Sequence, residues 1–422
     1  MATITAPQLS KVHGGLDQPV HRIDISAASR PGLDSIEVRD IDRTTLYRIA
    51  DGTLSPLTGP MGITDYETVL ERGAIERDGD YWAWTIPIIL PVTAEEAALC
   101  RPGQEISLRD SEGQPFGTLK VSSCYDWDKE RFLQKVYRTK RTDHPGARLW
   151  LSDDRRHLVG GDISLVPFAD ERPFARRIQN PTHTRSLIET RGWEQSVAFQ
   201  TRSPLQRAHE YALVYGAESI LRATGKFTGV VLNPLVWDTP QDDVPAEVRM
   251  ETYAALIDGR VLGEGDLDEE LWAAKGQKLA DNLALVGLDM RLFYAGPAEA
   301  VMQAIYRQNL GFTHFVVGRK HADAPYDDKT AIWGDFDAQQ IFENLGGKLD
   351  IKTVNVGFAA YFEEIGRVGL VSENQGNMAI TTPSHKVREQ LMAGQEPDPR
   401  IMRASTSKIL MEYYAGIVEA GE

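Results

Sequence analysis

Residues 200–210 read Gln-Thr-Arg-Ser-Pro-Leu-Gln-Arg-Ala-His-Glu and directly follow the apolar run at residues 197–199. An apolar run next to a helix-start signal predicts a buried strand that leads into a helix, the repeating unit of doubly wound α/β folds. Ser203 is a favourable N-cap, Pro204 suits the first helical position, and Gln206 stands where a capping box carries Glu or Gln. We therefore expect the helix to begin after Ser203, with its N-terminus beside the end of the strand.

The residues around this helix start are suited to binding an anion. Unpaired backbone amides and the helix dipole both favour negative charge at a helix N-terminus. Gln200 and Arg202 precede the helix, and Gln206 and His209, three residues apart, share one face of its first turns. An arginine at a strand end can equally form a salt bridge, and a histidine in a helix more often packs than binds a ligand. The segment by itself leaves an anion site and an ordinary capped helix both open.

The composition limits the class of protein. A chain of 422 residues should divide into two or three domains, and a net charge of −15 argues against nucleic acid or an acidic membrane as partner. The two cysteines, Cys100 and Cys124, cannot form a disulfide framework and lack the spacing of zinc ligands. No signal peptide and no membrane-spanning run stands out. We therefore expect a soluble, cytoplasmic protein with no zinc site.

The pattern along the chain changes near residue 170. Before that point, short apolar runs alternate with turn signals, which predicts a β-rich domain. Residues 82–90 and 104–110 are strand-like, and residues 110–113 resemble a hairpin turn. Much later, the acidic and polar stretch at residues 262–281 is expected to be a surface insertion.

Beyond residue 173 the pattern alternates between strand and helix, which predicts a doubly wound α/β domain. In that fold, ligands bind at the carboxyl ends of the strands. Asn233 and Gly318 follow two predicted strands, as Gln200 follows the first one, so all three segments should meet at one edge of the sheet. The predicted strands are residues 197–199, 230–232 and 314–317. The predicted helices between the last two strands are residues 246–257 and 298–309.

Two motifs carry a resemblance to a known family. Residues 200–209 resemble the Gln-x-Arg-Asn-Pro-x-His-x-x-His signature of ATP sulfurylases, and residues 317–322 resemble the second signature of that family, Val-Gly-Arg-Asp-His-Ala. Other similar segments follow in the family order at residues 54–59, 86–88, 158–161, 245–249 and 295–297. The resemblance implies a β-rich, PUA-like N-terminal domain over residues 1–170, a nucleotidyltransferase domain over residues 171–330 and a small C-terminal α/β domain over residues 331–422.

The family reaction joins the adenylyl group of ATP to sulfate and releases pyrophosphate, which requires two anions to be positioned and moving charge to be stabilised. The resemblance implies a nucleoside triphosphate with Mg²⁺, held mainly by the nucleotide and water, and a homo-oligomer. It places the oxyanion at Gln200, Arg202 and Ala322. The implied catalytic residues are Thr201, Arg202, Ser203, Gln206, His209 and Arg319. The implied nucleotide-binding residues are Gln200, Thr201, Arg202, Ser203, Gln206, His209, Asn233, Gly318, Arg319, Lys320 and His321.

Several positions of these motifs depart from the family pattern. Ser203 replaces an asparagine, Gln206 and Asn233 each replace a histidine, Lys320 replaces an aspartate, and Asp323 replaces a glycine. Gln206 can still donate a hydrogen bond to phosphate but cannot carry charge. We expect Lys320 to face the anion pocket and compensate for this lost charge.

The departures leave three functions open. The first is a sulfate adenylyltransferase of divergent sequence. The second is a paralogue that transfers AMP or another nucleotidyl group to a different oxyanion, such as a phosphonate or sulfonate. The third is a non-catalytic protein that binds a nucleotide or an anion.

Overall fold

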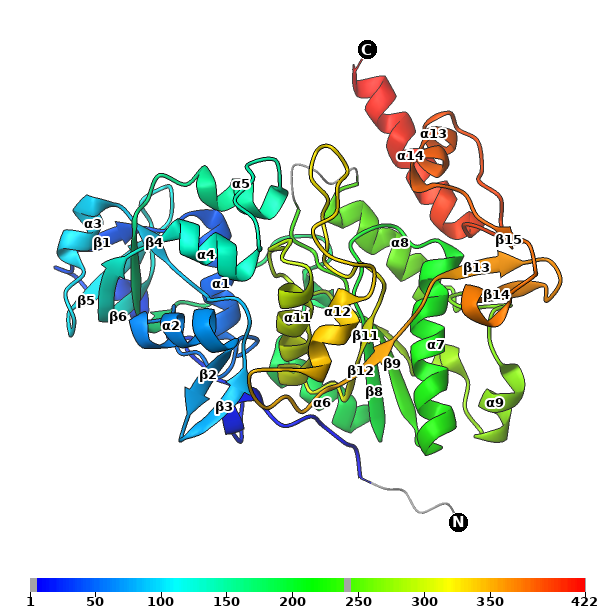
Figure 1. Ribbon diagram of the computed structural model, residues 1–422, viewed down its shortest axis with the longest axis horizontal. Helices are drawn as coiled ribbons and strands as arrows, with labels where there is room; N and C mark the ends of the chain where they lie inside the picture. Colours follow the sequence, from blue (N-terminus) through cyan, green and yellow to red (C-terminus); the bar gives the residue numbers. More distant parts are fainter. Residues whose placement is uncertain (1–5, 239–243, 422) are drawn as a thin grey trace.

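The computed structural model describes residues 6–238 and 244–421, which form a β-rich N-terminal part, a central parallel sheet and a C-terminal segment (Figure 1). The N-terminal sheet has the order β1-β5-β6-β7-β4 and is antiparallel except between β1 and β5. Its strands are β1 (Ser35–Glu37), β4 (Pro91–Val92), β5 (Glu105–Arg109), β6 (Pro115–Asp126) and β7 (His157–Leu165). Around it lie α1 (Asp40–Ala50), α2 (Ile63–Arg72), α3 (Ala94–Leu99), α4 (Lys129–Val136) and α5 (Pro145–Leu151).

The strand predictions for this part are confirmed at one place and wrong at another. Residues 105–109 form β5, and the turn after it is closed by the amide of Gly113, which donates to the carbonyl of Asp110 at 2.9 Å. The expected strand at residues 82–90 is wrong, because the strand there, β3 (Asp80–Ala83), ends at Ala83, where it pairs with β2 (Ala74–Arg77). Trp84 is fully buried beyond the end of that ladder, so its apolar character reflects the core and not a strand.

The central sheet is fully parallel, with the order β10-β9-β8-β11-β12, and confirms the predicted doubly wound architecture. Alternate residues of one strand enter different cores: Val230 and Leu232 pack with α7 and α8, whereas Val231 packs with α6 and α11. The strands are β8 (Gln195–Phe199), β9 (Thr228–Leu232), β10 (Leu283–Leu285), β11 (His314–Val317) and β12 (Lys352–Asn355). The helices are α6 (Pro181–Arg191), α7 (Arg207–Thr224), α8 (Ala246–Asp258) and α11 (Pro297–Asn309).

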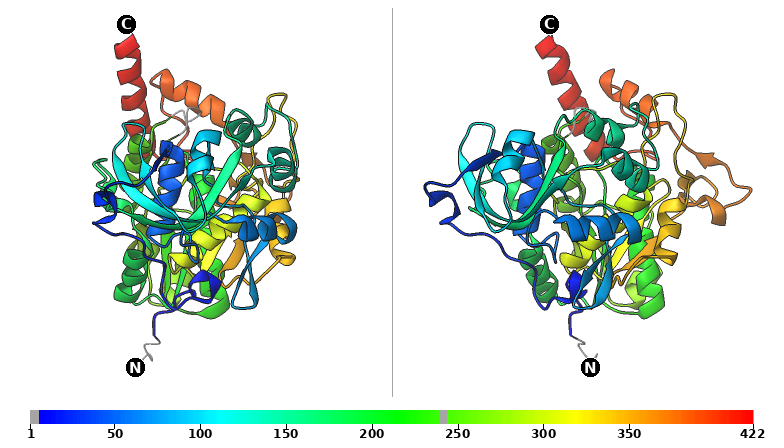
Figure 2. Two further views of the ribbon diagram at one scale, coloured as in Figure 1. Left: turned by 90° about the vertical axis from the view of Figure 1, so that its left-hand side faces the viewer. Right: turned by 60° about the vertical axis from the view of Figure 1, so that its left-hand side comes forward.

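The C-terminal segment adds one strand to this sheet and then covers one end of it. Strand β12 lies beyond residue 330, so the predicted boundary at residues 330/331 runs between two strands of one sheet; the domain limits stay predictions. A three-stranded sheet then packs on α7, and α13 and α14 pack together beside α8, with α14 projecting from the molecule (Figures 1 and 2). These elements are α12 (Asp337–Gln340), β13 (Ala359–Phe362), β14 (Arg367–Leu370), β15 (Ala379–Ile380), α13 (Ser384–Met392) and α14 (Ala404–Gly421).

The acidic stretch at residues 262–281 is not merely a surface insertion, which corrects the sequence prediction. It contains α9 (Glu269–Ala274) and leads into α10 (Leu279–Asn282), and its Trp272 is 3% exposed. The indole of Trp272 donates to Glu218 of α7 at 3.2 Å, and Asp266 binds Arg207 at the start of the same helix. A few apolar residues among many acids were enough to anchor the segment. Short 3-10 turns elsewhere are η1 (His13–Gly15), η2 (Ala27–Ser29), η3 (Ala175–Arg177), η4 (Ile341–Glu343) and η5 (Val371–Glu373).

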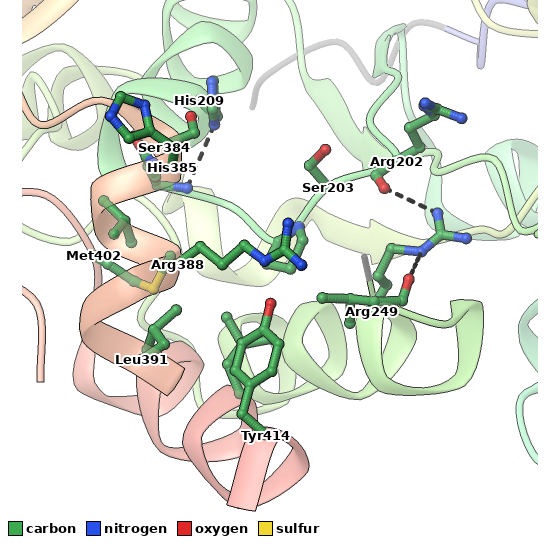
Figure 3. Close-up of a pocket in the computed structure, with 15 residues that line it drawn as sticks. Arg202, Ser203, His209, Arg249, Ser384, His385, Arg388, Leu391, Met402 and Tyr414 are labelled. Carbon is green, nitrogen blue, oxygen red and sulfur yellow. Dashed lines mark hydrogen bonds between the residues drawn. The ribbon is translucent and has the colours of Figure 1, made fainter. Parts of the chain in front are cut away.

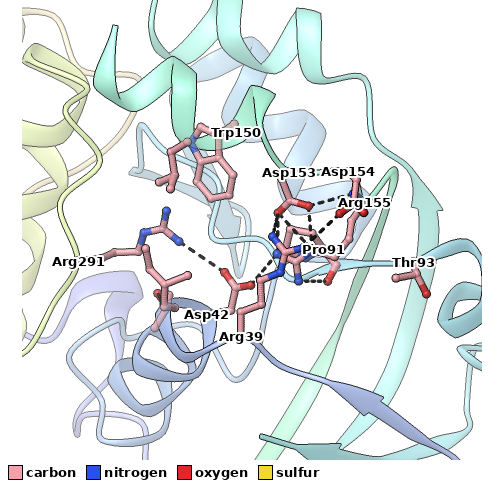
Figure 4. Close-up of polar contacts among 12 residues, drawn as sticks. Arg39, Asp42, Pro91, Thr93, Trp150, Asp153, Asp154, Arg155 and Arg291 are labelled. Atoms are coloured by element: carbon pink, nitrogen blue, oxygen red, sulfur yellow. Dashed lines mark hydrogen bonds and ion pairs between the residues drawn. The ribbon is translucent and has the colours of Figure 1, made fainter. Parts of the chain in front are cut away.

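A cluster of buried charges joins the N-terminal part to the central domain. Asp42 of α1 accepts hydrogen bonds from Arg155 at 3.0 Å and from Arg291, which follows β10, at 3.5 Å (Figure 4). Arg155 also binds Asp153, and these four side chains are at most 5% exposed. The guanidinium of Arg291 lies 4.6 Å from the ring of Trp150. Breaking this cluster would leave charge buried without compensation, so it fixes how the two parts meet.

Candidate functional site

The loop after β8 differs from its prediction in where the helix begins. Helix α7 starts at Arg207 with Gln206 as N-cap, three residues later than expected. The carbonyls of Arg202 and Ser203 are bound from α8, by Arg249 at 3.0 Å and Tyr253 at 2.9 Å, and the amide of Arg207 donates to Ile401 at 2.8 Å. In a helix that starts at Pro204, the amide of Arg207 would donate to the carbonyl of Ser203. Both groups instead form hydrogen bonds to other parts of the protein, so the helix starts later than the local capping signal indicates.

The new helix start places Gln206 and His209 side by side. The backbone amide of Gln206 donates to Nδ1 of His209 at 3.5 Å. A ring nitrogen that accepts a hydrogen bond carries no proton, so the neutral imidazole holds its proton on Nε2. Nε2 of His209 is thus available as a donor on an exposed side chain.

A pocket of about 580 Å³ opens at this helix start, between the loop and the C-terminal helices (Figure 3). Arg388 of α13 extends into it from the side opposite the loop. The predicted residues that line it are Arg202, Ser203, Gln206 and His209. The other lining residues are Pro204, Val244, Arg249, Ser384, His385, Val387, Arg388, Leu391, Met402, Leu410 and Tyr414.

Sequence reasoning missed two parts of this pocket. Arg249 was quoted only as a family-like landmark, yet it is 2% exposed and its guanidinium binds the carbonyls of Val244, Arg202 and Leu235, each at 3.0 Å. It is therefore a brace for the floor of the pocket. The far wall, including Arg388, comes from residues about 180 positions away in the chain, within the predicted C-terminal α/β domain. The signals present were an arginine in the predicted helix at residues 246–257 and a basic residue in that domain.

A second pocket, of about 320 Å³, adjoins the first and shares Gln206, His209 and Ser384 with it. Its remaining wall is largely apolar and comes from the three-stranded sheet and the loop before it. These residues are Ala208, Phe358, Ala359, Ala360, Tyr361, Ile380, Thr381, Thr382, Pro383, Arg400 and Ile401. Gln206 and His209 thus line both pockets.

Arg202 also reaches toward the second motif. Its Nη1 donates to the hydroxyl of Tyr294 at 3.2 Å, and the guanidinium lies 5.4 Å from that ring. Two residues later, the amide of Gly296 donates to the carbonyl of Ala322 at 3.0 Å. Arg202 and Ala322, which the sequence placed at one oxyanion, therefore contact the same short turn. Gln200, in the same loop as Arg202, has a buried side-chain oxygen that lacks a hydrogen-bond partner among the described residues.

The second motif follows β11 and is held mostly by contacts within the protein. Arg319 binds Asp335 at 2.9 Å and its guanidinium lies 5.1 Å from the ring of Phe358, a residue of the second pocket. Lys320 lies 3.5 Å from the same carboxylate, so the structure pairs this residue with Asp335. Its expected role of compensating charge in the pocket stays a prediction.

Two further predicted residues of this edge are held by side-chain hydrogen bonds; His321 is half-buried and Asn233 is fully buried. His321 makes a 2.6 Å hydrogen bond through Nε2 to the side-chain oxygen of Gln303, and burial lowers the pKa of His321 to about 4. Asn233 is fully buried after β9, where its side-chain amide donates to the carbonyl of Val286. Gly318 immediately follows β11, and nothing lies within 4 Å of where a side chain would begin. The structure thus brings Arg202, Ser203, Gln206 and His209 to the main pocket, and leaves Asn233 and the second motif outside its lining.

The part of the chain that the structure describes contains no group of three or more histidine, cysteine, aspartate or glutamate side chains placed to hold a metal ion. No helix within residues 6–238 and 244–421 is long and apolar enough to cross a membrane.

Comparison with known proteins agrees with this architecture. Residues 17–167 match the model of a PUA-like domain, and residues 176–413 match the ATP-sulfurylase model. A sulfate adenylyltransferase from Pyropia yezoensis is 60% identical over 409 residues, which cover 96% of this chain and 97% of that relative. One from Synechococcus sp. strain JA-3-3Ab is 36% identical over 374 residues, 88% of this chain and 86% of the relative. A solved structure described as a hexameric APS kinase from Thiobacillus denitrificans shares the fold, with a TM-score of 0.69 and 18% identity over 96% of this chain and 68% of that one.

The match to the ATP-sulfurylase model and the sulfate adenylyltransferase relatives identify the chain as an enzyme of the nucleotidyltransferase class. The chain belongs to the ATP-sulfurylase family.

Proposed function

We propose that this chain transfers the adenylyl group of ATP to sulfate. A sulfate oxygen attacks the α-phosphorus, the bond from that phosphorus to the oxygen bridging to the β-phosphate breaks, and pyrophosphate leaves with the electron pair. Adenosine 5′-phosphosulfate is the second product. The observation that carries the proposal is the 60% identity to a sulfate adenylyltransferase over nearly the whole of both chains.

The two adjoining pockets suit the two ends of ATP. The larger one presents the donors of Gln206 and His209 on one side and the cationic Arg388 on the other, which fits a triphosphate. The smaller one, with Phe358, Ile380 and other apolar side chains, fits a base and ribose. We therefore assign the phosphates to the larger pocket and the base to the smaller one.

The sulfate is assigned to the side of the loop that faces the turn at residues 294–296. Arg202 and Ala322 both contact this turn, and Gln200 lies two residues before Arg202 in the chain. A planar guanidinium can bind two oxygens of a tetrahedral anion at once. Arg202 thus lies between the two substrates, where it can stabilise charge on both.

Mg²⁺ belongs to the same proposal. Since no carboxylate cluster for a metal is present among the described residues, the ion would come with the nucleotide and be held by phosphate oxygens and water. Bound there, it would neutralise charge on the leaving pyrophosphate. A cytoplasmic location and a homo-oligomer likewise stay proposals, and sedimentation of the purified chain would test the second.

Pyrophosphate release tests the proposal directly. We would measure it from ATP, CTP, GTP and UTP with Mg²⁺, with sulfate, other oxyanions or no acceptor, and use Arg202→Ala as the control for the site. Turnover that needs both ATP and sulfate, and that Arg202→Ala lowers by about 10²–10³, is the expected result. Turnover with another pair would identify a paralogue with a changed substrate. Nucleotide-induced thermal stabilisation without any turnover would instead identify a binding protein.

A further inference from the structure

Two buried polar side chains of α11 connect the two motif loops, and neither belongs to a motif. Glu299 and Gln303 are four residues apart on one helical face, and each is 1% exposed. The side-chain amide of Gln303 donates to Oε1 of Glu299 at 3.1 Å. A buried polar pair inside a helix packed against the sheet needs a reason, because unsatisfied groups there are destabilising.

Glu299 holds the turn that Arg202 contacts. Its carboxylate accepts the amide of Phe293 at 3.2 Å and the amide of Ala295 at 3.1 Å, on either side of Tyr294. Tyr294 has a φ of 57°, a left-handed conformation that is unfavourable for an aromatic residue and needs support from its surroundings. Glu299 thus fixes the residue whose hydroxyl binds Arg202.

Gln303 holds the second motif loop and fixes the protonation of its histidine. Because a carboxylate only accepts hydrogen bonds, the amide nitrogen of Gln303 must point at Glu299 and its oxygen at His321. Nε2 of His321 must then carry the proton. The same loop contains Lys320 and Ala322 at φ values of 49° and 56°, so it too is held in an unfavourable backbone conformation.

We propose that Glu299 and Gln303 are positioning residues that set the spacing of the two motif loops and keep a proton on Nε2 of His321. His321 then acts by orienting its loop. The chain of contacts runs from Arg202 through Tyr294 and the carboxylate of Glu299 to Gln303 and His321. The hydrogen bond between Gly296 and Ala322 closes the same connection through the backbone.

The test uses Gln303→Leu, which keeps the volume but removes both hydrogen bonds. The matched control is Gln308→Leu on the same helix, since Gln308 is also fully buried and bonds to Lys11 and Asp350, away from both loops. The kinetic effect rests on the proposed function. Misplacing a reacting group by about 1 Å lowers rates by about 10². We expect kcat/KM for sulfate to fall by about that factor in Gln303→Leu and to stay within about threefold in Gln308→Leu.

The protonation of His321 is measured without turnover. In the full chain labelled with ¹⁵N and ¹³C at histidine, and assigned with His321→Gln, the ring should show the Nε2–H tautomer at about pH 7.5. In Gln303→Leu that tautomer should no longer be fixed. A wild-type ring that carries its only proton on Nδ1 at this pH, or a tautomer that is unaffected by Gln303→Leu, would overturn the proposal. Silence of the wild type with ATP and sulfate would contradict only the proposed function.

Activity of position 321 variants separates the two roles of the ring. Glutamine at this position keeps an N–H donor for Gln303, whereas alanine does not. We expect His321→Gln to retain at least tenfold more kcat/KM than His321→Ala. Equal losses in both variants, with the whole effect on the KM for ATP, would mean that the imidazole binds the nucleotide and does not position the loop.

Discussion

The pocket at the start of α7 and the charged cluster between the two parts of the molecule are both rich in arginine, but they use it differently. In the cluster, Arg155 binds the carboxylates of Asp42 and Asp153, and all three are nearly inaccessible (Figure 4). At the pocket, Arg202 contacts a tyrosine hydroxyl and an aromatic ring, and Arg388 is an exposed side chain that reaches into the open volume (Figure 3). The burial of Arg155 and the exposure of Arg388 at the pocket thus separate a structural role from a ligand-binding one.

The largest effect should come from breaking the cluster. Asp42→Asn leaves Arg155 and Arg291 without one of their negative partners inside the protein, and loss of one member of a buried pair costs about 3–5 kcal/mol. Urea unfolding should show that loss of stability, while kcat/KM of the folded fraction stays within about twofold. The control is Asp154→Asn, since Asp154 is 86% exposed and its pair with Arg39 should contribute less than about 1 kcal/mol. A large rate change in Asp42→Asn would mean that the two regions are coupled.

At the pocket we expect the opposite: a large fall in turnover and a small change in stability. Gln206→Ala removes one donor aimed at the phosphates, and loss of such a donor typically lowers kcat by about 10²–10³. Stability should change by less than about 1 kcal/mol, because the side chain is only half-buried. The matched control is Gln390→Ala on α13, which is outside the lining of either pocket. Unchanged turnover in Gln206→Ala would remove Gln206 from the site.

The sheet could be predicted from the sequence because its strands and helices follow local patterns. Helix α8 spans Ala246–Asp258 where residues 246–257 were predicted, and the run at residues 314–317 is β11. The start of α7 could not be predicted, since hydrogen bonds from Arg249 and Tyr253 of another helix decide it. Local capping preference amounts to about 1 kcal/mol, which such tertiary contacts override.

The site was only partly predictable for the same reason. Gln206 and His209 lie in one motif and reach one pocket, as their spacing indicated. Arg388 lies opposite them only because α13 packs with α14, which packs on α8, and no local pattern encodes that arrangement. Glu299 and Gln303 are polar residues four apart in the helix predicted at residues 298–309. That helix also buries Arg307, Gln308 and Asn309, so polarity alone could not single them out.

An intermediate effect, a loss of stability, should appear at the buried His13 when the pH is lowered. Burial lowers the pKa of His13 from 6.5 to about 4, and Nε2 of this ring binds the carbonyl of Ala83 at 2.8 Å. Between these pKa values the unfolded chain binds more protons at His13 than the folded protein does. The contribution of the neutral ring to the unfolding free energy is therefore complete above about pH 6.5 and is lost as pH falls toward 4. At pH 5 the loss from this one group is about 2 kcal/mol. Urea unfolding of wild type and of His13→Asn at about pH 7.5 and pH 5 measures the loss of unfolding free energy on acidification. That loss should be smaller in His13→Asn by about 2 kcal/mol. An equal loss in both proteins would contradict the lowered pKa of His13.

The smallest effect is expected where the second motif meets Asp335. The pair between Arg319 and Asp335 is about 40% exposed on both sides, so Asp335→Asn should change stability by less than about 1 kcal/mol. The same change removes the negative charge that Arg319 and Lys320 both contact. Both cations can then interact more strongly with the phosphates of ATP. The KM for ATP should therefore fall, by no more than about fivefold, because 1 kcal/mol corresponds to about that factor. The gain should shrink as salt is raised, since exposed charges are screened. A rise in KM would show instead that Asp335 holds Arg319 in its productive position. The arginine of the second motif would then be held by a carboxylate, as Arg155 is in the buried cluster.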